Sequence, residues 1–525
     1  MDESKKMVIV NHSIDSINAQ WLLKKEAIYL DKCYAIETPV DNVETGIAYS
    51  IINDNGDRYA LYFTALPLIY LAATDNIVDE PKVPATFTMV ESNTHTITSD
   101  IGIETRGGYT QGAYAKKSYK IVFREDASQQ NNKDVSLLGM RSDDDWDLQA
   151  MANEPLRMNE KTSFDIWRKI NRLSYQSSEP DAVNGSRMNY AELFLNGEYK
   201  GVYCVSEPVD RKQLKLKKYD ENKGIRGELY KSNGWGATVF LNCPPYDNNS
   251  FSWVNEIGHG YECEYPNEVF PDWKKMYDFV YFVMYGSDAD FYARYHTFFN
   301  VENLVDYFLL MNVARAWDNA GKNLFVARYN TNEPYFYVPW DYDGTFGTKW
   351  DGSKEPATGD IKTNVFYRRL LKDYSGNGFM QKLQEKWKQL RNDWLTISGL
   401  MDMFYENYNF LLENGIYERE ELIWSEKDNY HFDNQYIDYM ENWITERLSY
   451  LDETFKNYSA LPLIDVQEIH YPCNIHVYNV NGQLIKTMYL TDSESGNLGN
   501  NLNRGIYFIH LQNENAVKMH KIIVK

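Results

Sequence analysis

The sequence predicts an α+β fold, with a strand-rich lobe before a helix-rich lobe and a small all-β unit at each end. Three observations predict this order. Alternating strand-like runs fill most of residues 1–150, helical periodicity covers 268–315 and 361–456, and alternating strands return after residue 459. With 525 residues and 43% hydrophobic content, the chain is long enough for about two to four domains with buried cores.

The first half of the chain is predicted to consist mainly of strands. Residues 1–65 contain short runs such as "GIAYSIIND" and "RYALYFTA" between turn residues, which favours a small β-sandwich-like domain. Strands continue to "KKSYKIVFRED" near residue 120. A helix is then expected from about Asn153, because a cap residue, Pro155 and apolar residues at helical spacing follow one another. The next hairpin is centred on Asn196-Gly197, a strong turn signal.

A second hairpin is predicted between the two helical blocks. Its strands are "NLFVARY" and "PYFYVPW", rich in aromatic and β-branched residues and joined by the turn-forming "NTNEP". A hairpin brings its two ends together. Asp318 and Asn323, before the first strand, should therefore face Asp341 and Asp343, after the second.

Composition excludes several classes of protein. A formal net charge of -21 argues against a general nucleic-acid or anionic-membrane binder, which would need clustered Lys and Arg. No run is long enough for a membrane span, and the opening "MDESKK" lacks the apolar core of a signal peptide. Either the protein is cytosolic or an export signal has been removed. The five cysteines are not spaced as in a zinc knuckle, and they do not indicate in which cellular compartment the protein lies. They are Cys33, Cys204, Cys243, Cys263 and Cys473.

The ends of the second hairpin carry the residue types that phosphoryl transfer requires. This reaction needs a carboxylate to orient the acceptor hydroxyl, hard oxygen ligands for Mg²⁺, and a cation on the phosphates. In protein kinases a catalytic Asp is followed five residues later by a metal-binding Asn, then a hairpin, then a metal-binding Asp. The order Asp318, Asn323, hairpin, Asp341 is similar. Asp343 is a further metal candidate, although both later aspartates also suit turn positions.

Candidate nucleotide contacts lie in the strand-rich lobe. Lys117 is preferred over Lys116 and Lys120 as the phosphate-binding lysine, while a solvated strand face would explain all three. Arg106 either holds phosphate or supports a turn. Glu207 lies at the expected hinge between the lobes, where backbone groups would meet adenine and its own side chain would be structural.

Four motifs in order resemble the CotH family, the spore coat protein H type of atypical kinase: "IETRGGYTQGAYAKKSYKIVF", "LLGMRSDDDWDLQA", "YAELFLNGEYKGVYCVSEPVDR" and "VPWDYDGTFG". The resemblance covers roughly residues 66–450 and implies an atypical bilobal protein-kinase-like fold. It also implies ATP- and Mg²⁺-dependent phosphorylation of Ser or Thr on a surface or coat protein, with Asp318 catalytic and Asp341 a magnesium ligand. The chain departs from the family's Arg-Asn pair, because Met158 separates Arg157 from Asn159.

The last segment resembles the C-terminal sorting domain of proteins exported across bacterial outer membranes. Its pattern is "VYNVNGQLIK" followed by "LNRGIYFIHL", with turns expected at Asn481-Gly482 and Arg504-Gly505. This resemblance implies a surface or extracellular location, a signal removed from the N-terminus, and contact with a secretion machinery. The predicted domains are 1–65, a kinase-like domain 66–458 with lobes 66–220 and 221–458, and 459–525.

Three functions follow from these observations. The first is an exported CotH-like kinase acting on a surface or secreted protein. The second is a kinase-fold surface protein without transfer activity, which binds glycans or protein partners through its 42 Tyr and 13 Trp. The third is transfer of a whole nucleotide. A calcium site at "SDDDWD" is disfavoured, because its spacing differs from an EF-hand loop and suits a solvated loop.

Overall fold

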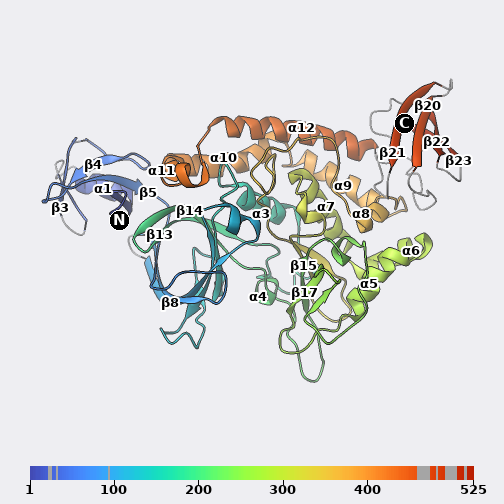
Figure 1. Ribbon diagram of the computed structural model, residues 1–525, viewed down its shortest axis with the longest axis horizontal. Helices are drawn as coiled ribbons and strands as arrows, with labels where there is room; N and C mark the ends of the chain where they lie inside the picture. Colours follow the sequence, from blue (N-terminus) through green and yellow to red (C-terminus); the bar gives the residue numbers. More distant parts are fainter. Residues whose placement is uncertain are drawn as a thin grey trace.

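The structure, a computed structural model, describes residues 1–21, 27–30, 33–38, 40–92, 95–457, 473–479, 483–490, 505–512 and 517–524. Its helices and strands confirm the expected α+β class. Figure 1 shows an N-terminal sheet at one end of the molecule and a C-terminal sheet at the other, with the strand-rich and helix-rich parts between them. Among the described residues, no helix combines the length and the apolar composition of a membrane span.

The N-terminal region forms one mixed sheet with a helix, where the sequence favoured a β-sandwich. Its strand order is β1-β5-β4-β3-β2, and β1 is parallel to β5. Ile17 of the helix lies in the same buried cluster as Ile51 and Phe63 of the sheet, so the helix covers the apolar face that a second sheet would cover in a sandwich. The elements are β1 Met7–Asn11, α1 Ile14–Trp21, β2 Ala27–Tyr29, β3 Cys33–Ile36, β4 Tyr49–Ile52 and β5 Arg58–Thr64.

The following strands close into a barrel of order β12-β14-β13-β6-β7-β8-β9. Its core is filled by fully buried side chains such as Phe87, Phe123 and Trp146. The predicted turn at Asn196-Gly197 joins β13 and β14 as expected. The strands are β6 Leu68–Ala73, β7 Val83–Ser92, β8 His95–Arg106, β9 Ser118–Arg124, β12 Asp145–Gln149, β13 Met188–Leu195 and β14 Glu198–Ser206; the short elements beside them are α2 Tyr109–Ala113, β10 Val135–Ser136 and β11 Ser142–Asp143.

Helix α3, Asn159–Ile170, begins six residues after the predicted start. Arg157 has a φ of 53°, in the left-handed region. A right-handed helix cannot continue through this residue, so it cannot begin at Asn153. The carboxylate of Glu154 instead accepts the backbone N–H groups of Asn159 and Glu160, at 2.6 and 3.3 Å. Glu154 therefore satisfies the free donors of the first helical turn from outside the helix.

A second sheet, of order β16-β17-β15-β18-β19, contains the predicted hairpin. Strands β18 and β19 pair antiparallel, with Leu324 opposite Pro339, so this prediction is confirmed. The elements are α4 Arg211–Leu214, β15 Glu228–Asn233, η1 Ala237–Val239, β16 Ser252–Val254, β17 Gly260–Tyr265, η2 Asp318–Ala320, β18 Leu324–Arg328 and β19 Phe336–Pro339.

Both predicted helical blocks are present. Every side chain of α7 from residue 303 to 314 is buried, so this helix forms the centre of the largest hydrophobic core. Helices α10 and α12 pack on each other along the upper edge of Figure 1. The bounds are α5 Lys274–Tyr285, α6 Asp288–Phe298, α7 Val301–Ala314, α8 Val365–Leu370, α9 Phe379–Asn392, α10 Ile397–Glu413, α11 Ile416–Asp428 and α12 Gln435–Asn457.

The C-terminal strands form an antiparallel sheet of order β21-β20-β22-β23. The predicted turn at Asn481-Gly482 and the first residue of the turn at Arg504-Gly505 lie outside the described residues, and Gly505 begins β22. The strands are β20 Cys473–Asn479, β21 Leu484–Leu490, β22 Gly505–Gln512 and β23 Val517–Val524.

A buried charge cluster joins the barrel to helix α11. Glu420 pairs with Lys116 and with Arg157, both at 2.9 Å, and all three side chains are at most 1% exposed. Glu420 also accepts the backbone N–H of Val202 in β14 at 2.8 Å. Gly201 has a φ of 83°, and a Cβ there would lie 1.8 Å from the Glu420 carboxylate. Only glycine therefore allows the strand to approach Glu420 so closely.

Replacing Glu420 by Ala should destabilise the protein by about 3–5 kcal/mol, because two buried cations would lose their shared partner. Denaturant unfolding of Glu420→Ala against wild type measures this, with Glu426→Ala, an exposed position on the same helix, as the matched control. Equal stability of the two variants would show that the cluster does not hold α11 on the barrel.

Candidate active site

A large cavity lies between the barrel and the second sheet. It encloses about 810 Å³ and receives side chains from both parts of the structure. Arg106, Lys116 and Lys120 come from the barrel side, and Lys231 comes from β15. The four hairpin residues singled out in the sequence also line it: Asp318, Asn323, Asp341 and Asp343. The structure therefore brings these four residues to one cavity, as the predicted hairpin requires.

Hydrogen bonds from one side chain hold the open end of the hairpin together. The Asn319 side chain donates to the carbonyl oxygens of Asn323 and Trp340, at 3.0 and 2.8 Å, and so links the chain before β18 to the chain after β19. Asn323 and Asp341 have φ values of 54° and 56°. Left-handed backbone of this kind is uncommon outside glycine, so the local structure is constrained where the candidate side chains project.

Asp318 begins the short 3-10 turn η2, directly before the hairpin. Its backbone carbonyl accepts the N–H of Lys322 at 2.9 Å, which closes the turn. Burial raises the pKa of Asp318 above its ordinary value; Lys322 opposes this shift and Asp341 adds to it. A carboxylate with a raised pKa is a better proton acceptor near neutral pH than an ordinary one.

The structure adds Glu160, which the sequence analysis did not single out. Glu160 lies in the first turn of α3, is buried, and lines the cavity. Burial raises its pKa well above the ordinary value, and Asp341, Glu154 and Asp343 raise it further. In sequence, an acidic residue in a first helical turn is adequately explained by the helix dipole, so nothing in the local pattern distinguishes it.

Glu160, Asp341 and Asp343 repel one another inside the cavity. Burial raises the pKa of Asp341, and the positive charges of Arg106 and Lys322 partly offset this rise. Burial also raises the pKa of Asp343 well above its range, and Asp341 adds to the shift. A divalent cation beside such carboxylates would favour their charged forms. These carboxylates and Asn323 line the same cavity and supply oxygen donors, the type of ligand that a hard cation such as Mg²⁺ prefers.

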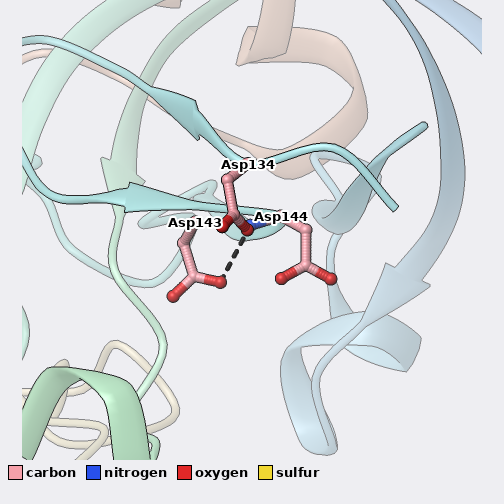
Figure 2. Close-up of side chains that lie close together, drawn as sticks. All are labelled: Asp134, Asp143 and Asp144. Atoms are coloured by element: carbon pink, nitrogen blue, oxygen red, sulfur yellow. Dashed lines mark hydrogen bonds between the residues drawn. The ribbon is translucent and has the colours of Figure 1, made fainter. Parts of the chain in front are cut away.

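Another acidic cluster, shown in Figure 2, fits a cation less well. Asp134, Asp143 and Asp144 are the one group of three carboxylates, among the described residues, with oxygens all within 4.8 Å of one another. The ammonium of Lys212 lies 3.6, 2.9 and 2.7 Å from these three side chains, and Arg141 pairs with Asp143 at 2.7 Å. Protein cations thus already neutralise this part of the "SDDDWD" segment.

Arg106 lies where a phosphate contact was expected. It lines the cavity, stacks over the Trp340 ring at 5.3 Å and lies 3.4 Å from Asp147. It also hydrogen-bonds the side chain of Gln149. Its guanidinium is close enough to Asp341 to oppose the rise of that carboxyl's pKa. Arg106 can therefore contact an anion held near Asp341.

Lys117 and Glu207 are not brought to the cavity wall. The ammonium of Lys117 donates to the backbone carbonyls of Gln111 and Tyr114. Lys120 lines the cavity instead, as strand alternation explains, because its neighbours Tyr119 and Ile121 are buried in the barrel.

At the expected hinge, the Glu207 carboxylate binds Arg187 at 2.6 Å and accepts the backbone N–H of Arg141 at 3.1 Å. Pro208 and Val209, the next two residues, line the cavity. The residues that follow Glu207, rather than Glu207 itself, therefore border the cavity.

Comparison with known proteins identifies relatives of the chain. Residues 103–451, about two thirds of its length, match the protein family described as CotH kinase protein. Residues 461–525 match the secretion system C-terminal sorting domain. The inner spore coat protein H of Bacillus subtilis (strain 168) is 21% identical over 290 residues, which cover 54% of this chain and 67% of that protein.

Replacing Asp343 by Asn should stabilise the metal-free protein at pH 8, because burial and the nearby Asp341 carboxylate disfavour the ionised form of Asp343. A folded-state pKa above the unfolded one means that the ionised carboxylate destabilises the fold at high pH. The gain should shrink as pH falls through the raised pKa, and vanish near the ordinary value of about 4.

Thermal unfolding in chelator at pH 8 and pH 4 measures this difference. Asp351→Asn is the control, because Asp351 is exposed and its pKa is lowered by the hydrogen bond from the Ser353 side chain, so its replacement should bring no gain. A lower melting temperature for Asp343→Asn at pH 8 would contradict the proposed repulsion.

Proposed function

The chain belongs to the CotH kinase protein family, and we propose that it is an exported atypical kinase that transfers the ATP γ-phosphate to Ser or Thr of a surface or secreted protein. One observation carries the proposal: carboxylates and a carboxamide meet basic residues across one cavity. Family membership supports the reaction class, and the sorting domain supports export through a secretion machinery. The barrel and the helical part correspond, in this proposal, to the two lobes of a kinase.

We assign the nucleotide to the cavity by charge. Arg106 and Lys120 take the phosphates, with Lys120 in the role first given to Lys117. Asp341, Asn323 and Asp343 hold Mg²⁺, with Glu160 beside them. When bound, the ion neutralises charge that develops on the transferring phosphoryl group. The carboxylate oxygens of Glu160, Asp341 and Asp343 do not all lie within 4.8 Å of one another, so these residues alone would not surround an ion. This arrangement suits Mg²⁺, because this ion usually shares its coordination with phosphates and water.

In the reaction, Asp318 orients the acceptor hydroxyl. The hydroxyl oxygen forms a bond to the γ-phosphorus as the bond from that phosphorus to the β–γ bridging oxygen breaks, and ADP leaves with the electron pair. The hydroxyl proton passes to the Asp318 carboxylate, whose raised pKa favours this transfer. Arg106, at the opposite wall, stabilises the negative charge on the phosphates.

Exposed aromatic side chains favour a second candidate function, the binding of glycans or proteins without phosphoryl transfer. Tyr109, Trp317 and Trp350 line the cavity and are 53%, 52% and 40% exposed. Large apolar surfaces of this kind commonly mark recognition sites. This function requires no nucleotide, so nucleotide binding distinguishes it from the first.

Asp341→Asn should abolish saturable, Mg²⁺-dependent ATP binding, because it removes the central metal carboxylate. Asp318→Asn should retain that binding and lower phosphoryl transfer by about 10²- to 10⁴-fold, the usual contribution of a general base. Calorimetric titration with ATP, with and without Mg²⁺, measures the first effect, and phosphate incorporation into protein substrates the second.

Asp393→Asn, an exposed position at the end of α9, is the matched control and should behave as wild type. If wild type does not bind millimolar ATP in the presence of Mg²⁺, the kinase proposal fails and the binding function is favoured. Incorporation of the whole nucleotide, seen by intact mass, would replace phosphoryl transfer by nucleotidyl transfer.

A further inference from the structure

Asp318 lies on a wall shared by two cavities. The second cavity encloses about 320 Å³ and extends to Asn319, Gly344, Lys349, Glu355 and Lys362. The residues that line both cavities are Trp317, Asp318, Asn323, Asp341, Asp343 and Trp350. If a nucleotide fills the larger cavity, the smaller one still gives an acceptor hydroxyl access to Asp318.

Two tryptophans give the second cavity an apolar lining. Trp317 and Trp350 are each large, exposed, and supported by another ring. The Trp317 ring lies 5.3 Å from that of Trp235, and the Trp350 ring packs edge to face on Tyr109 at 4.6 Å. Indoles held in this way lose little conformational freedom when a ligand packs on them.

Lys349 supplies a positive charge at the same cavity. Its ammonium makes no hydrogen bond or ion pair with any residue that the structure describes, and its backbone N–H is bound to the carbonyl of Ser353 at 2.8 Å. Lys362, the other lysine there, is buried and lies 3.4 Å from Asp360 and 3.7 Å from Glu355. Lys349 is therefore the lysine of this cavity that can bind a ligand anion.

We propose that the second cavity is the acceptor site, and that it takes a Ser or Thr in a peptide segment that also carries an aromatic and an acidic side chain. The aromatic side chain packs on Trp317 and Trp350, and the acidic one pairs with Lys349. This inference rests on the proposed kinase function. A peptide is favoured over a neutral glycan, because a glycan could stack on the tryptophans but would offer no negative charge to the Lys349 ammonium.

Charge exchange between enzyme and peptide tests the proposal. Peptides with one Ser, one Tyr and either Glu or Lys at each neighbouring position are phosphorylated by wild type, Lys349→Glu and Lys349→Met. Wild type should prefer Glu peptides in kcat/KM by about tenfold, as one charged hydrogen bond supplies. Lys349→Glu should prefer Lys peptides, and Lys349→Met should show neither preference.

Lys388→Glu, an equal change of charge at an exposed position of α9, should keep the wild-type preference. Calorimetric ATP binding by wild type, measured in parallel, reports on the kinase proposal separately. Phosphorylation with the same preference in wild type and Lys349→Glu overturns the acceptor assignment and leaves the kinase function standing. Phosphorylation of oligosaccharides in place of peptides likewise overturns the acceptor assignment and leaves the kinase function standing. Absence of both ATP binding and transfer in wild type overturns both.

Discussion

The position of Glu420 is the constraint on which the rest of the site depends. This carboxylate reaches from helix α11 to a lysine before β9, an arginine before α3 and a backbone N–H of β14. The three contacts fix the side of the barrel that forms one wall of the cavity, and Lys116 belongs to that wall. A buried charge of this kind is stable only when every partner is present, so the cluster also specifies how the barrel and the last helices fit together.

The cavity gathers carboxyl groups whose charged forms are unfavourable there. Glu160, Asp341 and Asp343 come from two parts of the chain. Burial raises the pKa of each, and the charge of Asp341 raises the pKa of the other two further. A fold selected for stability alone would not gather them, whereas a site that binds a cation and phosphates needs this arrangement. The CotH family membership and the proposed Mg²⁺-nucleotide site thus account for the same feature. The sorting domain adds only the route by which such a protein would leave the cell.

Local features of the fold were predictable from the sequence, and long-range ones were not. The β18–β19 hairpin follows from aromatic and β-branched runs around a turn, and its closure brings Asp318, Asn323 and Asp341 to one cavity. The closed barrel depends on pairing between distant strands, such as β6 with β13, which no local pattern specifies. Strand alternation could have shown that Lys120 is a better candidate than Lys117. No local pattern could have identified Glu160, because its role arises only from a hairpin far along the chain.

Anomalous X-ray diffraction from crystals of the protein grown with Mn²⁺ and a non-hydrolysable ATP analogue would locate both the metal and the nucleotide. A manganese peak is expected about 2 Å from the Asp341 carboxylate, the distance of direct coordination, with the analogue's phosphates between it and Arg106. A manganese peak confined to Asp143 and Asp144, or an analogue bound outside this cavity, would show that the cavity is not the Mg²⁺-nucleotide site.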